Sequence, residues 1–235
     1  MNKRRKQIVL AIDVGGTHVK VMTTAHRTKR EFESGAHLTA KTMVKKVKQL
    51  TSDWTYDRVS IGYPGPVIGN RAIREPHNLG RGWKGFDFEA AFDRPARVVN
   101  DALMQALGSY DDGRMLFLGL GTGLGSAMII DGILEPMELG HLPYRKKTFE
   151  DYIGAAGLER LGRKKWRRRV AEVINDLREA LEPDYIVLGG GNVAHIDELP
   201  PKTRRGDNEN AFLGGFRLWE PTTPSAKSRK KLRNK

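Results

Sequence analysis

The chain has 235 residues, enough to bury a sizeable core and to form one large domain or two smaller lobes. Apolar residues make up 39% and charged residues 29%, which is ordinary for a folded protein, and no apolar run is long enough to cross a membrane. The absence of cysteine excludes disulfides, thiolate metal sites and thiol nucleophiles, and it fits a cytoplasmic location.

The net charge of +13 is concentrated in three basic clusters, Lys3 to Lys6, Arg163 to Arg169 and Lys227 to Lys235. Such clustering predicts attraction to a polyanion, whether nucleic acid, an anionic lipid surface or a polyphosphate chain. For the two termini, the alternative is that the charge only keeps the protein soluble. The charge alone does not show which of these polyanions the protein binds.

The N-terminal half alternates strand and helix patterns. In chain order we expect a β-hairpin joined at glycines over 8–25, a helix over 41–51, a strand over 57–67 that ends in a Pro-Gly-Pro turn, a loop over about 69–85, a strand over 94–100 and a helix over 101–110.

The C-terminal half repeats part of this pattern. We expect strand, glycine turn and strand over 115–132, a helix over 158–182, a strand over 184–193, a short helix over 208–219 and a disordered basic tail over 222–235. The two strand–glycine–strand segments form a weak internal repeat, which indicates an α/β protein with mixed sheets and two lobes of related build. We place the lobes at 1–102 and 103–221, with the last helix able to pack back on the first lobe.

Three glycine turns follow apolar strands. A turn that holds phosphate brings backbone N–H groups close to oxygen anions, and a Cβ would obstruct that approach. The candidates are Gly15, Gly16 and Thr17, then Gly121, Thr122 and Gly123, then Gly189, Gly190 and Gly191. Asp13, just before the first turn, can hold a water of a magnesium ion. A single glycine turn is more often only a turn, but three of them at strand ends favour phosphate binding.

Two other well-known phosphate motifs do not fit the sequence. No G-x-x-x-x-G-K-[ST] motif occurs, which excludes a P-loop enzyme. GGGNVA fits the letters of a dinucleotide fingerprint, but only about forty residues follow it, too few for further βαβ units.

Asp101 follows the strand that ends in VVN and begins a helix, where a general base can reach an attacking hydroxyl. The alternative is a helix cap, which Asn100 or Asp101 serves equally well. Glu138, His141 and Glu150 crowd a short span and are suited either to sugar hydroxyls or to a metal ion. With one histidine in this span and no cysteine, a structural zinc site is not expected.

Together these segments resemble the ROK family of sugar kinases over about residues 8–219. AIDVGGTHVKV is similar to the first phosphate motif of the family, VVNDA to its catalytic segment, LGLGTGLGSAMIIDG to its second phosphate motif, ELGH to its sugar-binding signature and IVLGGG to its adenosine-side glycines. The five motifs in this order are far more specific for the family than any one of them alone.

The resemblance implies a two-lobed actin-like ATPase (ribonuclease H-like) fold with a cleft between the lobes. It implies that Asp101 takes the proton from the 6-hydroxyl of a hexose such as glucose. Asn100, Glu138, His141 and Glu150 would hold other hydroxyls, and Gly65 and Asn78 would line the same pocket. The same resemblance implies Mg²⁺, a polyphosphate or ATP donor and a homodimer.

The chain departs from the common family pattern in the segment TFEDYIG, which lacks the cysteines of a zinc motif. We therefore expect no zinc, a shortened loop from His141 to Glu150, and a His141 that is available to the sugar. With twelve residues before Asp13, we expect a chain outside the repressor branch of the family.

The segments NLGRGWKGFD and LGTGLGSA and the small size most resemble the polyphosphate glucokinase branch. The basic helix segment 163–169 offers a polyanionic donor a cationic track, although it can also be a solvated helix face. Two alternatives stay open: an ATP-dependent glucokinase or other ROK hexokinase, and a basic nucleic-acid-binding module with an inactive kinase core. No recognised nucleic-acid-binding motif supports the latter.

Overall fold

A computed structural model describes residues 7–207 and 209–220. The basic clusters at both termini and the tail expected over 222–235 therefore lie outside the described residues. The described chain divides into two compact units. Unit 1 holds residues 7–104 and 211–220, and unit 2 holds residues 105–207 and 209–210.

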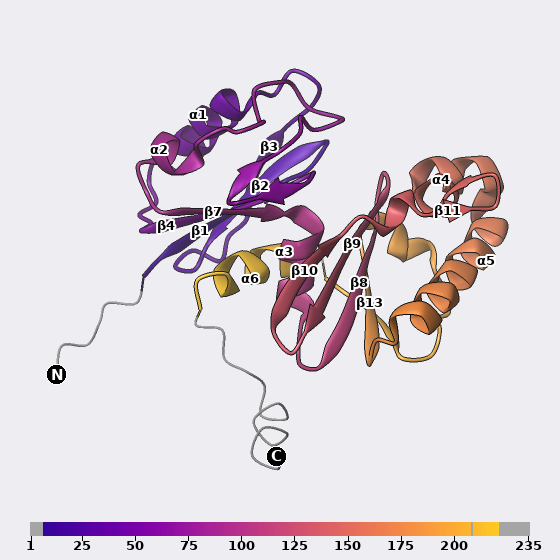
Figure 1. Ribbon diagram of the computed structural model, residues 1–235. Helices are drawn as coiled ribbons and strands as arrows, with labels where there is room; N and C mark the ends of the chain where they lie inside the picture. Colours follow the sequence, from indigo (N-terminus) through magenta and orange to yellow (C-terminus); the bar gives the residue numbers. More distant parts are fainter. Residues whose placement is uncertain (1–6, 208, 221–235) are drawn as a thin grey trace, which may run out of the picture. The chain divides into compact units, whose positions relative to one another are not determined.

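Unit 1 is built on a five-stranded mixed sheet in the order β3-β2-β1-β4-β7 (Figure 1). Its strands are β1 Val9–Val14, β2 His18–Thr23, β3 Arg30–Glu33, β4 Arg58–Tyr63 and β7 Ala96–Asn100. The first three strands are antiparallel neighbours, and β4 and β7 run parallel to β1. A small hairpin, β5 Val67–Ile68 and β6 Arg71–Ala72, lies within the region expected to be a loop.

Helices cover both faces of this sheet. On one face lie α1 Ala40–Leu50 and α2 Phe88–Phe92, which pack on alternate residues of β1 such as Leu10 and Ile12. The other face, with Val9 and Ala11, is covered by α6 Asn210–Arg217. Alternate side chains of β1 are therefore buried on opposite faces of the sheet. Such burial on both faces agrees with the short continuous apolar run in its sequence.

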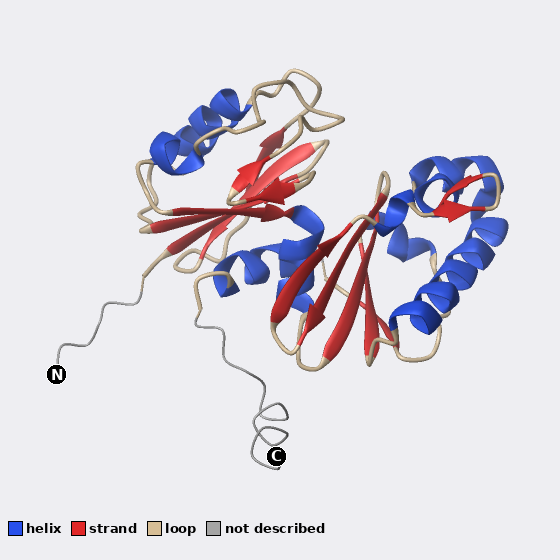
Figure 2. Ribbon diagram, viewed as in Figure 1, coloured by secondary structure: helices blue, strands red, loops and turns tan. Residues whose placement is uncertain are grey.

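Unit 2 is built on a second five-stranded sheet in the order β10-β9-β8-β13-β14. Its strands are β8 Arg114–Leu120, β9 Leu124–Ile130, β10 Ile133–Met137, β13 Tyr185–Gly189 and β14 Thr203–Arg205. The other elements are the 3-10 helices η1 Leu139–His141 and η2 Gly191–His195, the hairpin β11 Pro143–Tyr144 and β12 Lys147–Thr148, and the helices α4 Phe149–Ile153 and α5 Ala155–Leu181. Figure 2 shows α5 lying along one face of this sheet.

Both sheets share one design: a three-stranded antiparallel meander followed by two strands parallel to the first. The expected internal repeat is thus present in the strand order as well as in the glycine turns. The mixed sheets and α/β class are as predicted. Helix α3, Asp101–Ser109, begins in unit 1 and continues into unit 2. None of the helices within residues 7–220 is both long enough and apolar enough to span a bilayer.

The helix expected over 158–182 differs from the observed one in two ways. It begins earlier, at Ala155, and Gly162 interrupts it with a φ of 72° and a ψ of 159°. Glycine tolerates this left-handed region, so the kink separates a short first part from the basic second part. The helix ends at Leu181, and Glu182 adopts a left-handed conformation just before Pro183.

Candidate active site

Asp101 is the first residue of α3 and directly follows the last residue of β7. Asn100 accepts a hydrogen bond through Oδ1 from the Leu103 backbone N–H at 3.1 Å, as a helix cap does. The Asp101 carboxylate accepts one from the Ala102 N–H at 2.8 Å. Asn100 therefore serves as the cap, and Asp101 accepts from a second amide of the first turn.

The sequence around β4 brings that strand close to the start of α3. A Cβ added at Gly62 would lie 2.5 Å from Met104 Cε and 3.4 Å from the Asp101 Cα. Asn100 also donates through Nδ2 to the Gly65 carbonyl at 3.2 Å. Asn100, Asp101 and Gly65, three of the predicted site residues, are thus held together in unit 1.

Asn78 belongs to a loop anchored by the fully buried Trp83. The Trp83 indole N–H donates to the Leu38 carbonyl at 3.0 Å, and the Glu75 carboxylate accepts from the Trp83 backbone N–H at 3.0 Å. The Asn78 Cβ lies 3.6 Å from the point where a Cβ of Gly16 would be. The loop therefore places Asn78 against the first glycine turn.

The first glycine turn is tight. Hydrogen bonds from the end of β3, a strand that was not predicted from the sequence, hold it. The Gly15 N–H donates to the His18 carbonyl at 2.9 Å, and a Cβ at Gly15 would lie 2.9 Å from the same oxygen. Ser34, just after β3, donates through Oγ to the Gly15 carbonyl at 2.8 Å and through its N–H to the Thr17 carbonyl at 2.9 Å. The two hydrogen bonds from Ser34 therefore hold the turn in place.

The carboxyl ends of β1, β4 and β7 meet at one edge of the first sheet, because the three strands are parallel neighbours. Asp13, Gly62 and Val99 form one row across them. Ligands of open α/β sheets bind outside such carboxyl ends. The first glycine turn, Gly65 and Asp101 all follow this edge, so the predicted residues of unit 1 converge there.

Asp13 lies opposite Lys20 in the β1–β2 pairing and is only partly exposed. Burial raises the pKa of the Asp13 carboxyl, and the Lys20 ammonium offsets this only in part. Among the described residues, no group of three or more His, Asp and Glu side chains is arranged to hold a metal ion. A lone carboxylate of this kind fits a magnesium ion that keeps most of its waters.

The second and third glycine turns are neighbours in unit 2. Their strands, β8 and β13, are parallel and adjacent, with Gly119 opposite Gly189. Asn192, just after the third turn, donates through Nδ2 to the Gly121 carbonyl at 2.9 Å. Nothing lies within 4 Å of the points where Gly121 and Gly191 would carry a Cβ. Two predicted phosphate turns therefore share one edge of the second sheet and leave space above their backbones.

Glu150, on α4, lies close to both the predicted sugar signature and the second glycine turn. Its Oε2 lies 2.6 Å from the point where Gly123 would carry a Cβ and 3.3 Å from the equivalent point of Gly140. Its Oε1 lies 3.7 Å from His141 Nε2. A side chain at either glycine would displace the carboxylate. His141 and Glu150 are thus brought together.

Glu138 precedes η1, and its side chain is exposed and makes no capping hydrogen bond to the helix. Its carbonyl accepts from the His141 N–H at 3.2 Å. Thr122 is held through its carbonyl, which accepts from the Ala155 N–H at 3.1 Å. Glu138 is therefore linked to His141 by a backbone hydrogen bond, and its side chain forms no hydrogen bond with Glu150.

The geometry agrees with comparison to known proteins. The model of the ROK family matches residues 9–157, well over half of the chain. This chain belongs to the ROK family. The segments matched include both phosphate turns of the hairpins, Asp101, the sugar signature and Glu150.

Curated relatives of this ROK protein include two named polyphosphate glucokinase. The one from Mycobacterium tuberculosis (strain H37Rv) is 28% identical over 158 residues, 61% of this chain and 59% of its own length. The one from Mycobacterium leprae is 26% identical over 211 residues, 82% of this chain and 62% of its own. The chain thus spans about three-fifths of the length of these relatives.

Solved structures share the fold. An inorganic polyphosphate/ATP-glucomannokinase from Arthrobacter sp. strain KM superposes with a TM-score of 0.77 at 22% identity, covering 89% of this chain and 97% of that one. A ROK family glucokinase from Streptomyces griseus, in complex with glucose and AMPPNP, gives 0.73 at 16% identity, covering 90% and 98%. The protein therefore has the actin-like ATPase fold of ROK kinases, as expected.

The basic segment of α5 in this ROK protein is only partly available to a ligand. Arg167 donates to the His195 carbonyl and forms an ion pair with Asp197. Arg168 lies 3.3 Å from Glu172. Lys164 and Lys165 are exposed and form no ion pair with another described residue. The cationic track predicted over 163–169 is thus reduced to the part before Trp166.

Glu172 is a structural residue of the site that no sequence motif indicates. Its carboxylate accepts from the Tyr144 hydroxyl at 2.5 Å, from Arg145 at 3.0 Å and from Arg169 at 2.7 Å. The Tyr144 ring packs on Phe149 at 5.3 Å. The hairpin between His141 and Glu150 is therefore fastened to α5.

These partners, first the Tyr144 hydroxyl and then the arginines, hold the pKa of Glu172 at about 2, below its ordinary value of 4.5. A depressed pKa stabilises the fold above pH 4.5, and the contribution disappears as the pH falls toward 2. We expect Glu172→Gln to lower the free energy of unfolding at pH 7 by about 1–2 kcal/mol. The difference from the wild type should shrink at pH 3, as measured by urea unfolding.

The matched control is Glu179→Gln. Glu179 is exposed, lies on the same helix and forms no ion pair with another described residue. It should change the free energy of unfolding by less than about 0.5 kcal/mol at either pH. An equal loss for Glu172→Gln at both pH values would show that the ionised carboxylate is not what fastens the hairpin.

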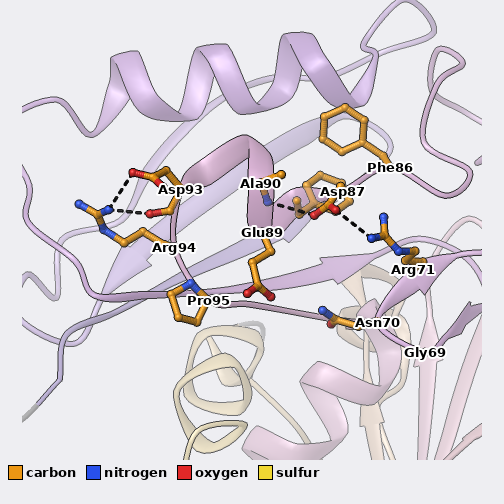
Figure 3. A pocket seen from close by; sticks show the side chains of 11 residues that line it. Gly69, Asn70, Arg71, Phe86, Asp87, Glu89, Ala90, Asp93, Arg94 and Pro95 are labelled. Atoms are coloured by element: carbon orange, nitrogen blue, oxygen red, sulfur yellow. Dashed lines mark hydrogen bonds and ion pairs between the residues drawn. The ribbon is translucent and has the colours of Figure 1, made fainter.

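One cavity of about 630 Å³ lies elsewhere in unit 1, beside α2 (Figure 3). Four of its charged groups form ion pairs, since Arg71 lies 2.8 Å from Asp87 and Arg94 lies 3.4 Å from Asp93, and Glu89 also lines it. Pro95, in its lining, precedes the amino end of β7, the end opposite Asp101. The cavity contains none of the predicted site residues.

Proposed function

We propose that this ROK protein transfers a phosphoryl group to the 6-hydroxyl of glucose, with Asp101 as general base. The observation that carries the proposal is the position of Asp101 directly after β7, where Asn100 caps α3 through the Leu103 N–H and the Asp101 carboxylate lies at the same end of the helix. A base in this position can orient and deprotonate an attacking hydroxyl. The glucokinase names of the relatives support the same reaction class.

The candidate sugar ligands are polar groups, some in unit 1 and some in unit 2. Asn100, Gly65 and Asn78 of unit 1 lie along the sheet edge that carries Asp101. His141 and Glu150 of unit 2 form one cluster, and Glu138 adjoins it. In this proposal, carboxylate and imidazole groups bind pairs of sugar hydroxyls, which fixes the nucleophile relative to the base.

The donor would be bound by the three glycine turns. Backbone N–H groups stabilise the charge that builds on the transferring phosphoryl oxygens, where a Cβ would block approach. The open backbone at Gly121 and Gly191 supports this role in unit 2. Asp13 would hold a hydrated Mg²⁺, which when bound supplies charge neutralisation to the donor oxygens.

We infer that inorganic polyphosphate is a donor, with ATP as the alternative. Arg163, Lys164 and Lys165 are the cations of segment 163–169 that form no ion pair with another described residue. Reversing the two lysines, Lys164→Glu with Lys165→Glu, should raise the KM for polyphosphate roughly 5- to 20-fold, since each exposed charge contact contributes up to about 1 kcal/mol. The KM for glucose should stay unchanged. Steady-state kinetics with polyphosphate as the varied substrate measures the effect.

The matched control is the same charge change on α1, Lys41→Glu with Lys45→Glu, because both lysines are exposed there. It should leave the KM for polyphosphate within about twofold. An equal rise in both variants would assign the effect to net charge and remove the α5 segment from the donor site.

The function itself is tested by a coupled assay that detects glucose 6-phosphate with polyphosphate and with ATP in parallel. Product with polyphosphate supports the proposal as stated. Product with ATP alone would make the protein an ATP-dependent glucokinase, and no product with either donor would contradict the kinase function.

A further inference from the structure

The segment of unit 1 that carries Asn78 is closed on itself by one carboxylate. Glu75 accepts hydrogen bonds from the Gly82 N–H at 3.2 Å through Oε1 and from the Trp83 N–H at 3.0 Å through Oε2. Burial raises the pKa of the Glu75 carboxyl, but backbone N–H groups lower it by more, so the group is ionised at neutral pH. We call residues 75–83 the Asn78 loop.

The Asn78 loop is packed against the rest of unit 1. Leu79 and Trp83 are buried, whereas Asn78 is exposed. The Leu38 carbonyl accepts from the Gly80 N–H and from the Trp83 indole N–H, both at 3.0 Å. A Cβ at Gly80 would lie 3.0 Å from the same carbonyl oxygen. Short loops with joined ends and a packed interior are Ω-loops, which are frequently functional.

Tyr63, the last residue of β4, fastens the first end of this loop. Its side chain is fully buried, and its hydroxyl donates to the Arg74 carbonyl at 2.8 Å. Its ring lies 5.7 Å from that of Trp83, centre to centre. Burial, and after it the charge of Glu75, raises the pKa of the Tyr63 hydroxyl, which therefore remains a hydrogen-bond donor. Both ends of the loop thus contact one buried tyrosine.

The same tyrosine supports the turn that contains Gly65. The Gly65 N–H donates to the Tyr63 carbonyl at 2.9 Å, and a Cβ at Gly65 would lie 2.9 Å from Cε1 of the Tyr63 ring. The Gly65 carbonyl accepts from Asn100, which caps the helix that begins at Asp101. Tyr63 therefore contacts both loop segments of unit 1 that are proposed to line the sugar site.

Asn78 itself adjoins the first glycine turn. Its Cβ lies 3.6 Å and its Nδ2 lies 3.8 Å from the point where Gly16 would carry a Cβ. The conformation of the loop therefore decides where the amide of Asn78 lies relative to this turn. A loop without its closing hydrogen bonds would have to lose conformational entropy before it could present that amide to a ligand.

We propose that Glu75 and Tyr63 are positioning residues of the sugar site. Glu75 holds the Asn78 loop closed, and Tyr63 fastens that loop beside the turn that contains Gly65. Neither side chain contacts the sugar. Both act by fixing the groups that meet the sugar hydroxyls before glucose arrives, which removes an entropic cost from binding and lowers the KM for glucose.

The proposal rests on the proposed function, because it takes glucose as the ligand and Asn78 as one of its partners. It differs from a purely structural role in one respect. If Glu75 acts through Asn78, its contribution to glucose binding disappears once the Asn78 amide is removed. If Glu75 only stabilises unit 1, its loss should weaken glucose binding by the same factor whether or not that amide is present.

The test measures the affinity of the full-length protein for glucose by isothermal titration calorimetry without a donor. The variants are Glu75→Ala and Tyr63→Phe, each made alone and together with Asn78→Ala. Glu75→Gln is the conservative variant, since its amide oxygen can still accept one of the two hydrogen bonds. The matched control is Glu89→Ala, because Glu89 is exposed on α2 and forms no ion pair with another described residue.

We expect Glu75→Ala to raise the Kd for glucose roughly 5- to 20-fold and Tyr63→Phe roughly 3- to 10-fold, since each loses hydrogen bonds that hold the loop. Glu75→Gln should lie between Glu75→Ala and the wild type. In the Asn78→Ala background, Glu75→Ala should change the Kd by less than about twofold. The control should stay within about twofold.

The kinetic consequence separates positioning from catalysis. Glu75→Ala should raise the KM for glucose by the same factor as the Kd and leave kcat within about threefold, as expected when an interaction common to the ground and transition states is weakened. Thermal unfolding identifies variants that are not folded at the assay temperature. The mildest change, Tyr63→Phe, keeps the buried ring and removes only the hydroxyl, so it tests the proposal even if Glu75→Ala unfolds.

Unchanged glucose affinity in both Glu75→Ala and Tyr63→Phe would overturn the proposal. An equal loss for Glu75→Ala with and without the Asn78 amide would also overturn it and leave Glu75 a structural role. Failure of the proposed function would look different, because the wild type itself would then bind no glucose. Glucose binding by the wild type with the same affinity in the variants contradicts the positioning role alone.

Discussion

Replacing Asp101 with asparagine is expected to lower kcat for glucose phosphorylation by roughly 10²- to 10⁴-fold, the range of a positioned general base. The amide keeps the shape of the side chain but cannot take the proton of the attacking hydroxyl. Asn100 still caps α3, so the fold should be retained. The KM for glucose should change little, because the substitution removes an interaction that matters in the transition state.

The control for this experiment is Asp176→Asn, an exposed aspartate on α5. It should leave kcat within about twofold, as expected for a surface substitution away from the site. Thermal unfolding of both variants separates loss of chemistry from loss of fold. Activity of Asp101→Asn within tenfold of the wild type, at unchanged stability, would remove Asp101 from the role of base.

Replacing Gly190 with alanine is expected to destabilise unit 2 by about 2–4 kcal/mol. Gly190 has a φ of 85°, and an added Cβ would lie 2.4 Å from the Leu120 carbonyl oxygen and 2.8 Å from the Leu120 nitrogen. Neither backbone atom can move without separating β13 from β8. The melting temperature should therefore fall by about 5–15 °C in scanning calorimetry.

The adjacent Gly191→Ala is the matched control. Its Cβ would meet no atom within 4 Å, so stability should change by less than about 0.5 kcal/mol. The same methyl group would point into the open space proposed for the donor, and the KM of the donor should rise. Equal melting temperatures for the Gly190 and Gly191 variants would contradict the close approach of the second and third glycine turns.

Much of the central part of each sheet was predictable from apolar pattern and glycine placement. The hairpin of β1 and β2, the helix α1 and the junction of β7 with α3 lie where the sequence predicts them. These elements are buried on one or both faces, so burial imposes a clear pattern on their residues. The candidate base was found for the same reason, since it follows a buried strand directly.

Three of the strands that were not predicted, β3, β10 and β14, lie at the ends of the two five-stranded sheets. β3 reads Arg-Glu-Phe-Glu and is half-exposed, and β10 contains Pro136, which cannot donate to a neighbour. Such strands are defined by the partner they pair with more than by their own residues. The brace that Ser34 gives to the first glycine turn was missed with β3.

Contacts between residues distant in sequence could not be read from local pattern either. Arg167 has its acidic partner thirty residues away in Asp197, so its neutralisation was invisible in the basic run. The fastening of Tyr144 to Glu172 likewise joins a hairpin to a helix. Cases of this kind explain why fewer cations of the 163–169 segment lack an acidic partner than the basic run indicates.

The position of phosphorylation on the sugar is the most direct measurement. Purified protein is incubated with isotopically labelled glucose, Mg²⁺ and polyphosphate or ATP, and the product is identified by ³¹P and ¹³C NMR. We predict that phosphorus becomes attached at the 6-hydroxyl with the wild type and that Asp101→Asn gives no detectable product in the same time. Phosphate on another hydroxyl, or release of free phosphate without a sugar product, would contradict the proposed catalysis.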